Sequence, residues 1–192
     1  MSYIAQIFDP LGLVGPTIVV AKLSMQRLWA LKQNGEACEW DTALPTKIQE
    51  QWKAFHSTLQ LPSEVRVPRC VSLPNAINLQ LHFFVDASQG AYGSCCYVRA
   101  ETSGGVYVQL LTAKSKVAPL SSRHSIARLE LRAARLSTQL YEKVIFALKI
   151  SPPAYFCTDS NSVLHWLRSP PSRWKAFVAN RVSQIQHSTE PS

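Results

Sequence analysis

The sequence predicts an α/β protein in which a mixed β-sheet follows a small helical module. Two observations lead to this fold class. Residues 76–188 are ordered as strand, strand, strand, helix, strand, helix, helix. Upstream, two amphipathic helices end at a connector over residues 61–78, whose three prolines favour extended chain. We therefore expect a helical module over 1–75, an α/β domain over 76–188 and a loose tail over 189–192.

Two segments of the module have the apolar spacing of a helix. The first begins near Pro16, which suits the first turn of a helix, and runs to about Lys32. The second runs from about Pro45 to Leu59. The residues that share an apolar face are Ile18, Ala21, Met25, Leu28 and Trp29 in the first helix and Ile48, Trp52, Phe55 and Leu59 in the second.

The three strands of the second part are rich in valine, tyrosine, phenylalanine and leucine. They cover Leu79–Asp86, Ala91–Arg99 and Val106–Lys114, and turns that contain glycine separate them. Short connections of this kind join antiparallel neighbours. The three segments therefore predict a meander.

A long helix and a short strand follow the meander. The helix covers about Ser125–Leu148, and the strand covers Ala154–Thr158. Two further helices are expected over Ser160–Leu167 and Trp174–His187. A right-handed crossover through the long helix would place the short strand parallel to the first strand of the meander, which makes the sheet mixed.

Three carboxylates are expected to meet at one edge of this sheet. Asp86 ends the first strand and Asp159 follows the short one, so a parallel pair of strands brings them to the same edge. Glu130 lies on the crossing helix, and the small residues Ala133 and Ala134 beside it allow that helix to approach the sheet closely. The three form a candidate catalytic and metal-binding set.

Crowded carboxylates repel one another, and divalent cations relieve this repulsion. An all-oxygen site suits Mg²⁺ or Mn²⁺, and a pair of such ions would activate a water and stabilise the departing oxygen of a phosphodiester. Each acid alone has a simpler explanation as a helix cap or a solvated turn residue. Asp159, which precedes Ser160 and Asn161, also fits the start of a helix.

Positive charge is concentrated in the second part of the chain. Residues 1–75 carry 7 Lys and Arg against 6 Asp and Glu, whereas residues 76–192 carry 13 against 6, which gives net charges of +1 and +7. A basic domain suits a polyanionic partner. A merely soluble basic surface is the alternative interpretation.

Six segments together resemble the BEL/Pao retrotransposon polyproteins, in the region labelled the Pao retrotransposon peptidase family. Each segment is weak alone, and the combination is specific. The segments are Ile7-Phe8-Asp9-Pro10-Leu11-Gly12, Phe84-Val85-Asp86-Ala87-Ser88, Ala113-Lys114-Ser115-Lys116-Val117-Ala118-Pro119, Arg128-Leu129-Glu130-Leu131, Thr158-Asp159-Ser160 and Trp174-Lys175-Ala176-Phe177-Val178-Ala179-Asn180-Arg181.

The resemblance implies a ribonuclease H-like domain after the thumb or connection of a reverse transcriptase. The implied activity is two-metal hydrolysis of the RNA strand of an RNA·DNA hybrid during reverse transcription. Asp86 would bridge two Mg²⁺ (or Mn²⁺) ions, and Glu130 and Asp159 would complete the ligand set. The implied partners are the hybrid and the remainder of the polyprotein.

Ribonuclease H domains usually end with a further strand and a helix that brings a fourth carboxylate. The sequence stops at Ser192 before these elements. We therefore expect a domain that lacks its last strand and helix, and its activity depends on whether three carboxylates suffice or a longer parent supplies the fourth. The chain also lacks the paired aspartates of a polymerase palm, which excludes polymerisation by this fragment.

Five further residues are candidates for substrate contact: Ser88, Lys114, Lys116, Arg128 and Asn161. The cations among them lie in and after the third strand, near the expected acidic site, where they would hold phosphates of a hybrid. A solvated basic turn is the alternative for these cations.

Two other functions compete with the nuclease. A catalytically dead or domesticated copy would bind nucleic acid or a protein through its basic face. An aspartic peptidase would require Asp-Thr/Ser-Gly, but Asp86 precedes Ala87-Ser88 and Asp159 precedes Ser160-Asn161, so neither acid fits. We therefore rank the peptidase below the other two functions.

The chain carries no predicted membrane span or secretion signal. Its longest apolar stretch, Leu11–Leu23, is interrupted by Gly15 and Pro16 and is shorter than the roughly 18–20 residues of a span. We expect an intracellular protein of the cytoplasm or nucleus, with its five cysteines reduced. The sequence makes no prediction of oligomeric state.

Overall fold

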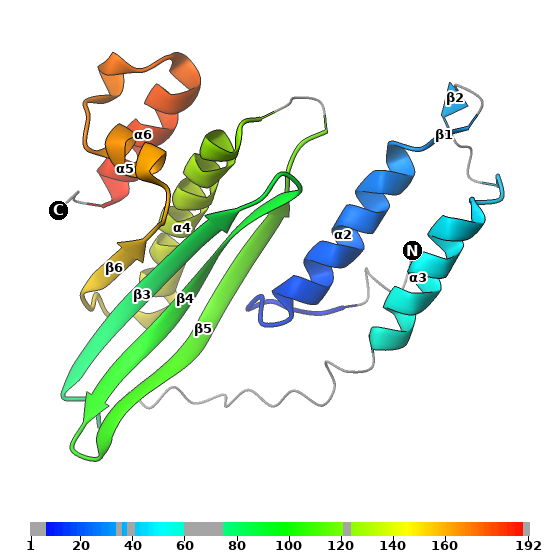
Figure 1. Cartoon of the computed structure of the whole chain (residues 1–192). Helices are drawn as coiled ribbons and strands as arrows, with labels where there is room; N and C mark the ends of the chain where they lie inside the picture. The colour runs from blue at the N-terminus through cyan, green and yellow to red at the C-terminus, as the bar shows by residue number, and fades with distance from the viewer. Residues whose placement is uncertain (1–6, 34–35, 38–40, 60–74, 121–123, 190–192) are drawn as a thin grey trace.

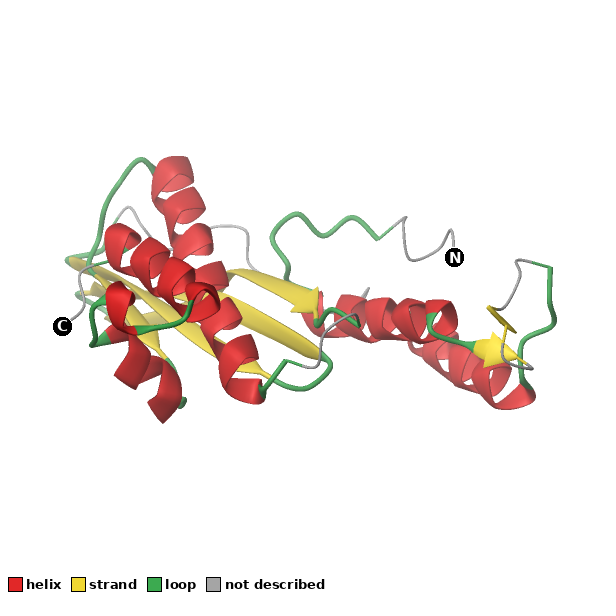
Figure 2. Cartoon of the chain, turned by 90° about the horizontal axis from the view of Figure 1, so that it is seen from above, coloured by secondary structure: helices red, strands yellow, loops and turns green. Residues whose placement is uncertain are grey.

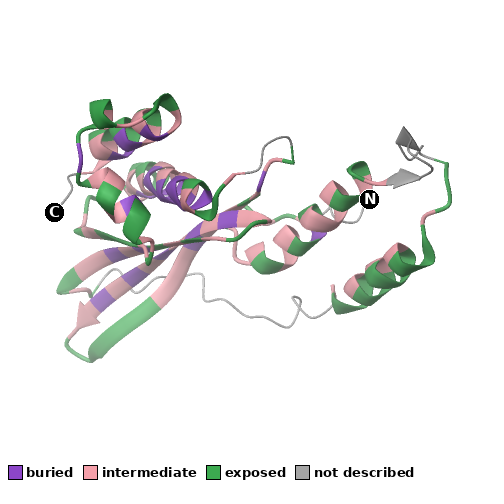
Figure 3. Ribbon diagram, turned by 45° about the horizontal axis from the view of Figure 1, so that its top comes forward, coloured by how far each residue is buried: buried purple, intermediate pink, exposed green. Residues whose placement is uncertain are grey.

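The computed structural model describes residues 7–33, 36–37, 41–59, 75–120 and 124–189 of the chain. Its first elements are helix α2 (Gly15–Trp29), a two-stranded antiparallel ribbon of β1 (Lys32–Gln33) and β2 (Glu36–Ala37), and helix α3 (Thr46–Thr58). Helix α2 lies beside the sheet (Figure 1), whereas no residue of α3 is buried (Figure 3).

A four-stranded mixed sheet forms the centre of the second part. Strands β3 (Asn78–Ala87), β4 (Ala91–Thr102) and β5 (Gly105–Val117) form an antiparallel meander, and β6 (Ala154–Cys157) pairs with β3 in parallel. The order across the sheet is β5-β4-β3-β6. The parallel register, Leu81 opposite Ala154 and Phe84 opposite Cys157, aligns the ends of β3 and β6.

Three helices cover one side of this sheet. They are α4 (Ile126–Leu148), α5 (Asn161–Leu167) and α6 (Ala176–Ser188), with a 3₁₀ turn at Pro171–Arg173 before α6. Helix α4 packs against β3 and β4, and α5 and α6 pack against α4. Seen from above, the N-terminal helices extend from one side of this helix-covered part (Figure 2).

The core lies on both sides of α4. One stripe of the helix packs against inward-facing residues of the sheet, and a second stripe packs against α5 and α6. The first stripe includes Leu129, Ala133, Leu136, Leu140 and Val144, and the second includes Leu131 and Ala134 against Val163, Val178 and Val182. Helix α4 therefore has buried residues on two faces because it lies between two layers.

The N-terminal loop is joined to the free edge of β5. The carbonyl of Leu11 accepts hydrogen bonds from the Ala113 amide at 2.7 Å and from the Thr112 hydroxyl at 2.7 Å. Gly12 has φ +74°, and a Cβ atom there would lie 1.8 Å from the carbonyl oxygen of Ala113. Glycine is required because the loop needs both this backbone conformation and the close approach.

The predicted order of elements is confirmed, and several boundaries differ. Strand β4 continues to Thr102 and strand β5 begins already at Gly105, because backbone pairing continues through polar residues near the turn. The first helix ends at Trp29 and not near Lys32, which lies in β1. The Asn-Gly pair that separates β1 from β2 in the sequence is a strong hairpin signal, which the helix interpretation overlooked.

The proposed division at residue 75 stays a prediction. Residues on both sides of it are in contact, since the side-chain amide of Gln26 in α2 donates to the carbonyl of Ala118 at 2.5 Å. Most of the predicted connector, residues 60–74, lies outside the described residues, as do residues 190–192 of the tail. The Thr189 amide donates to Ile185 at the end of α6.

Two further expectations concern the described residues. Cys95, Cys96 and Cys157 are free thiols, while Cys38 and Cys70 lie outside the described residues. None of the helices in the described ranges combines the length and the apolar character that crossing a membrane demands.

Replacing Gly12 with alanine should detach the loop from β5. The new methyl group would overlap the Ala113 carbonyl, so the Leu11–Ala113 hydrogen bond should break. We expect amide hydrogen exchange at Ala113 to become at least about tenfold faster, which corresponds to a loss of about 1.4 kcal/mol in local stability. Gly15→Ala is the matched control, because a Cβ atom at Gly15 meets nothing within 4 Å. Equal exchange rates in the two variants would contradict the steric argument.

Candidate functional site

Three carboxylates meet at the edge where β3 and β6 end. Asp86 and Asp159 each lie two residues beyond the paired positions Phe84 and Cys157, so the parallel register brings them to the same edge. Glu130 reaches them from the second turn of α4. One carboxylate oxygen of each acid lies within 4.8 Å of those of the other two.

The backbone amide of Ala87 connects two of the acids. It donates to Oδ1 of Asp86 at 2.7 Å and to Oε1 of Glu130 at 3.2 Å. This contact attaches the helix carboxylate to the end of β3. Sequence reasoning missed Ala87, because a backbone donor leaves no signal in residue type.

Glu130 is the buried member of the cluster, with 5% of its surface exposed, whereas Asp86 and Asp159 are exposed. Its second oxygen, Oε2, is buried and has no hydrogen-bond partner among the described residues. Burial raises the pKa of Glu130 above its ordinary value; the Ala87 amide opposes this shift, and the charges of Asp86 and Asp159 add to it.

The donor set fits a hard divalent cation. It offers only carboxylate oxygens, two of its members are open to solvent, and the unpartnered Oε2 of Glu130 lacks the compensation that a buried acceptor requires. Oxygen ligands of this kind are those that Mg²⁺ and Mn²⁺ prefer. The cluster is therefore chemically suited to hold such ions.

Asp159 does not cap helix α5. Ser160 is the N-cap residue, and its hydroxyl accepts from the Val163 amide at 3.4 Å, while the Thr158 hydroxyl accepts from the Ser160 amide at 3.2 Å. The hydroxyl groups on both sides of Asp159 thus accept from backbone amides at the start of the helix. Its carboxylate is left for the cluster.

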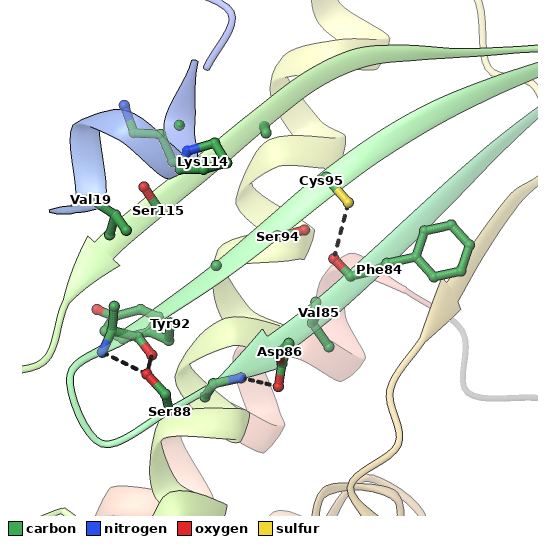
Figure 4. A pocket seen from close by; sticks show the side chains of 16 residues that line it. Val19, Phe84, Val85, Asp86, Ser88, Tyr92, Ser94, Cys95, Lys114 and Ser115 are labelled. Carbon is green, nitrogen blue, oxygen red and sulfur yellow. Dashed lines mark hydrogen bonds between the residues drawn. The ribbon is translucent and has the colours of Figure 1, made fainter. Parts of the chain in front are cut away.

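A groove of about 470 Å³ opens beside Asp86, between α2 and strands β3, β4 and β5 (Figure 4). Of the five substrate candidates, Ser88 and Lys114 line it together with Asp86. The Ser88 hydroxyl bonds to the backbone of Ala91 at 3.2 Å and so also shapes the turn between β3 and β4. Cys95 lines the groove as well, and burial raises the pKa of its thiol.

The other three candidates lie elsewhere. Lys116 lines a second groove, between α4, α6 and the sheet. The guanidinium of Arg128 lies 5.1 Å from the ring centre of Phe177. Asn161 is the exposed first residue of α5 and lines neither groove. The substrate-contact roles of all five residues stay predictions.

A scan of the sequence against protein families matches residues 1–160 to the family described as "Pao retrotransposon-like RNaseH-like domain". The chain belongs to this family. The match confirms the resemblance to a retrotransposon polyprotein and the ribonuclease H-like fold class. As a member of the Pao family, the chain is a ribonuclease H-like domain of a retrotransposon polyprotein.

Two solved structures of foamy virus proteins are similar to this Pao family chain. One is titled "Structure of the foamy viral protease-reverse transcriptase dRH in complex with ds DNA", with 14% identity and a TM-score of 0.47 over 97% of this chain and 32% of that chain. The other is the foamy viral protease-reverse transcriptase in complex with dsDNA, with 15% identity and a TM-score of 0.47 over 99% of this chain and 39% of that chain. The chain thus spans less than half the length of either protein. A comparison with curated proteins finds no match.

Removing the charge of Glu130 should stabilise the metal-free chain. Because the folded pKa of this acid is raised, its charged form destabilises the fold at pH values above that pKa, and the penalty disappears below the ordinary value of 4.5. Glu130→Gln keeps an oxygen that can accept from Ala87. We expect its Tm in EDTA at neutral pH to exceed that of the unchanged chain by about 2–4 °C per kcal/mol gained, with the difference shrinking toward pH 4.5.

Glu142→Gln is the control for this experiment, because Glu142 is an exposed acid on the same helix, and its 3.7 Å ion pair with Arg135 is of the surface kind that contributes about 0–1 kcal/mol. Its Tm should stay close to that of the unchanged chain at both pH values. A Glu130→Gln variant that unfolds earlier in EDTA at neutral pH would contradict the electrostatic argument.

Proposed function

We propose that this chain is a ribonuclease H-type nuclease module that hydrolyses the RNA strand of an RNA·DNA hybrid. The observation that carries the proposal is the convergence of Asp86, Glu130 and Asp159 within 4.8 Å at the end of two parallel strands. Membership of the Pao family and the net charge of +7 over residues 76–192 support a polyanionic substrate. The remainder of the polyprotein is the proposed partner.

The exposed and the buried acids have different parts in the proposed reaction. Asp86 and Asp159 are the exposed ligands, and they face the solvent from which a substrate phosphate would arrive. Glu130 fixes the position of the set, because it is buried and bonded to the Ala87 amide next to Asp86. When bound, two divalent ions would supply an activated water and would stabilise the leaving 3′ oxygen.

The groove beside Asp86 is the proposed position of the substrate strand. It opens along the strands that carry Asp86, and Ser88 and Lys114 line its wall. A lysine there can contact a phosphate as a point charge, and a hydroxyl can donate to a phosphate oxygen or a 2′-OH. The proposal assigns these two residues to substrate positioning.

The acidic cluster should bind Mn²⁺ or Mg²⁺. A ligand that binds only the folded chain raises its stability by about 2.7 kcal/mol at a concentration 100 times Kd. We expect Tm to rise with increasing Mn²⁺, and we expect Asp159→Asn to lose most of this rise because one charged ligand is gone. Glu142→Gln should keep it. An equal Mn²⁺ response in all three proteins would show that the ions bind elsewhere.

Hybrid cleavage is the direct test of the proposal. A labelled RNA·DNA hybrid incubated with Mg²⁺ or Mn²⁺ should be cut in its RNA strand, and Asp86→Asn should lower the rate at least about 100-fold, since even the loss of a group that only supports a metal ligand costs roughly 10–100-fold. Glu101→Gln, which changes a half-buried acid at the end of β4 that lies far from the cluster, is the matched control.

The outcomes of this assay separate the competing functions. Metal-dependent cleavage lost only in Asp86→Asn would establish the nuclease and would show that three carboxylates suffice. Hybrid binding without cleavage would instead support the alternative function, a nucleic-acid binding module that has lost or never completed its active site.

A further inference from the structure

A second groove, of about 330 Å³, lies between α4, α6 and the ends of β4 and β5. Four of its lining residues are cations: Lys116, Arg132, Arg135 and Arg181. We call it the arginine groove. Its other lining residues carry no charge, so no acid faces these cations within the groove. Its volume is within the range of roughly 300–1,000 Å³ that is usual for ligand pockets.

Three of the four cations have no carboxylate partner in the described part of the chain. Within that part the ion pairs are Arg99–Glu101 and Arg135–Glu142. Arg135 is therefore compensated, with Glu142 at 3.7 Å. Lys116, Arg132 and Arg181 bring three positive charges to one concave surface, which is an arrangement that attracts anions.

The ring of Phe177 contacts the guanidinium groups of both Arg132 and Arg181 and so restricts their positions. The guanidinium carbon of Arg181 lies 3.7 Å from the ring centre, and its Nη1 donates to the Phe177 carbonyl at 2.8 Å. Arg132 lies 5.6 Å from the same ring, and its Nη2 lies 3.3 Å from Nε2 of His124. Arginines fixed in this way lose little freedom when they bind a ligand, so their forked donors are prepared for an oxyanion.

Within the described ranges, Nε of Arg132 lacks a hydrogen-bond acceptor and Arg181 lacks a countercharge, and an anion would supply both. Nε of Arg132 is buried and has no hydrogen-bond partner among the described residues. The pKa of Arg181 is lowered, first by burial and then by the charge of Arg132, so the groove disfavours the charge of Arg181. A bound phosphate would provide both an acceptor and a countercharge.

The arginine groove and the acidic cluster lie at the same level of α4 but on opposite sides of that helix. Arg132 follows Glu130 by two residues, so the two side chains lie about 3 Å apart along the helix axis and about 200° apart around it. Tyr92 lines both the arginine groove and the groove beside Asp86. Its backbone pairs with Ala87, the residue after Asp86. A long polyanion that occupies one groove can therefore continue into the other.

We propose that the arginine groove binds a backbone phosphate of the nucleic acid, away from the bond that is cut. The choice of nucleic acid rests on the proposed function, because the neighbouring acidic cluster is assigned to phosphodiester hydrolysis. In this proposal Lys116 of β5, Arg132 of α4 and Arg181 of α6 contact the phosphate from the three elements that line the groove. The contact fixes the duplex relative to Asp86 and is independent of base sequence.

The test is hybrid binding as a function of salt. Fluorescence anisotropy of a labelled RNA·DNA hybrid is measured in EDTA over a series of KCl concentrations, for the unchanged chain, Lys116→Gln, Arg181→Gln and the double variant. The double variant should bind the hybrid with a Kd about tenfold higher than that of the unchanged chain. The slope of log K against log salt should become less steep by about 0.9, the value for one lost phosphate contact with a duplex. Lys116 is exposed, so Lys116→Gln alone decides the test if Arg181→Gln does not fold.

Arg173→Gln is the matched control. Arg173 is also an arginine against an aromatic ring, 5.7 Å from the ring centre of Trp174, but it is exposed on the 3₁₀ turn and does not line the arginine groove. Its variant should keep the slope of the unchanged chain. If Arg173→Gln reduced the slope as much as the groove variants do, net charge alone would explain the effect and the proposal would be overturned.

The remaining outcomes separate this proposal from the proposed function. An unchanged Kd and slope in a folded Lys116→Gln, Arg181→Gln double variant, together with normal cleavage, would overturn the groove and leave the nuclease standing. Reduced slopes in the groove variants of a chain that binds but does not cut would support the groove and overturn the nuclease. A chain that does not bind the hybrid at all would overturn the groove proposal.

Discussion

The parallel pairing of β6 with β3 determines where the functional groups of this domain lie. Two aspartates more than 70 positions apart in the sequence share one edge only because Phe84 is opposite Cys157. The pairing is short, and β6 has four residues. Stacking supports it, with 4.9 Å between the ring centres of Phe83 and Phe156, and so does the hydrogen bond from the Leu81 amide to Pro153 at 2.9 Å. A shift of one residue in this register would turn the side chains of β6 to the opposite face of the sheet and would displace Asp159 from its position beside Asp86.

The helix that makes this pairing possible also carries the third acid. Helix α4 is the crossover between the meander and β6, and its small buried residues Ala133 and Ala134 let it lie close to both layers. The same closeness places Glu130 in a buried position beside two other carboxylates. Stability and function are therefore opposed at this position, since the charge that suits a cation also weakens the metal-free fold.

How much the sequence could predict depends on the kind of interaction. The order of strands and helices follows from apolar periodicity, and the convergence of Asp86 and Asp159 follows from the handedness of the crossover. Backbone contacts have no such signal. The Ala87 amide that donates to both Asp86 and Glu130, and the close approach of Gly12 to the Ala113 carbonyl, were therefore not predicted. The arginine groove was missed because Arg132 and Arg181 belong to different helices, and only packing around Phe177 brings them together.

The contact of Leu11 with β5 has a consequence for how the chain behaves among its own copies. Strand β5 is an outer strand of the sheet. The backbone amide of Ala113, which has no partner strand on that side among the described residues, donates to the Leu11 carbonyl. An outer strand without such a cover is a template onto which another chain can add its own strand. The N-terminal loop therefore blocks this position of β5 against pairing with a strand of another chain. A chain shortened past Gly12 would leave the edge of β5 open to such pairing.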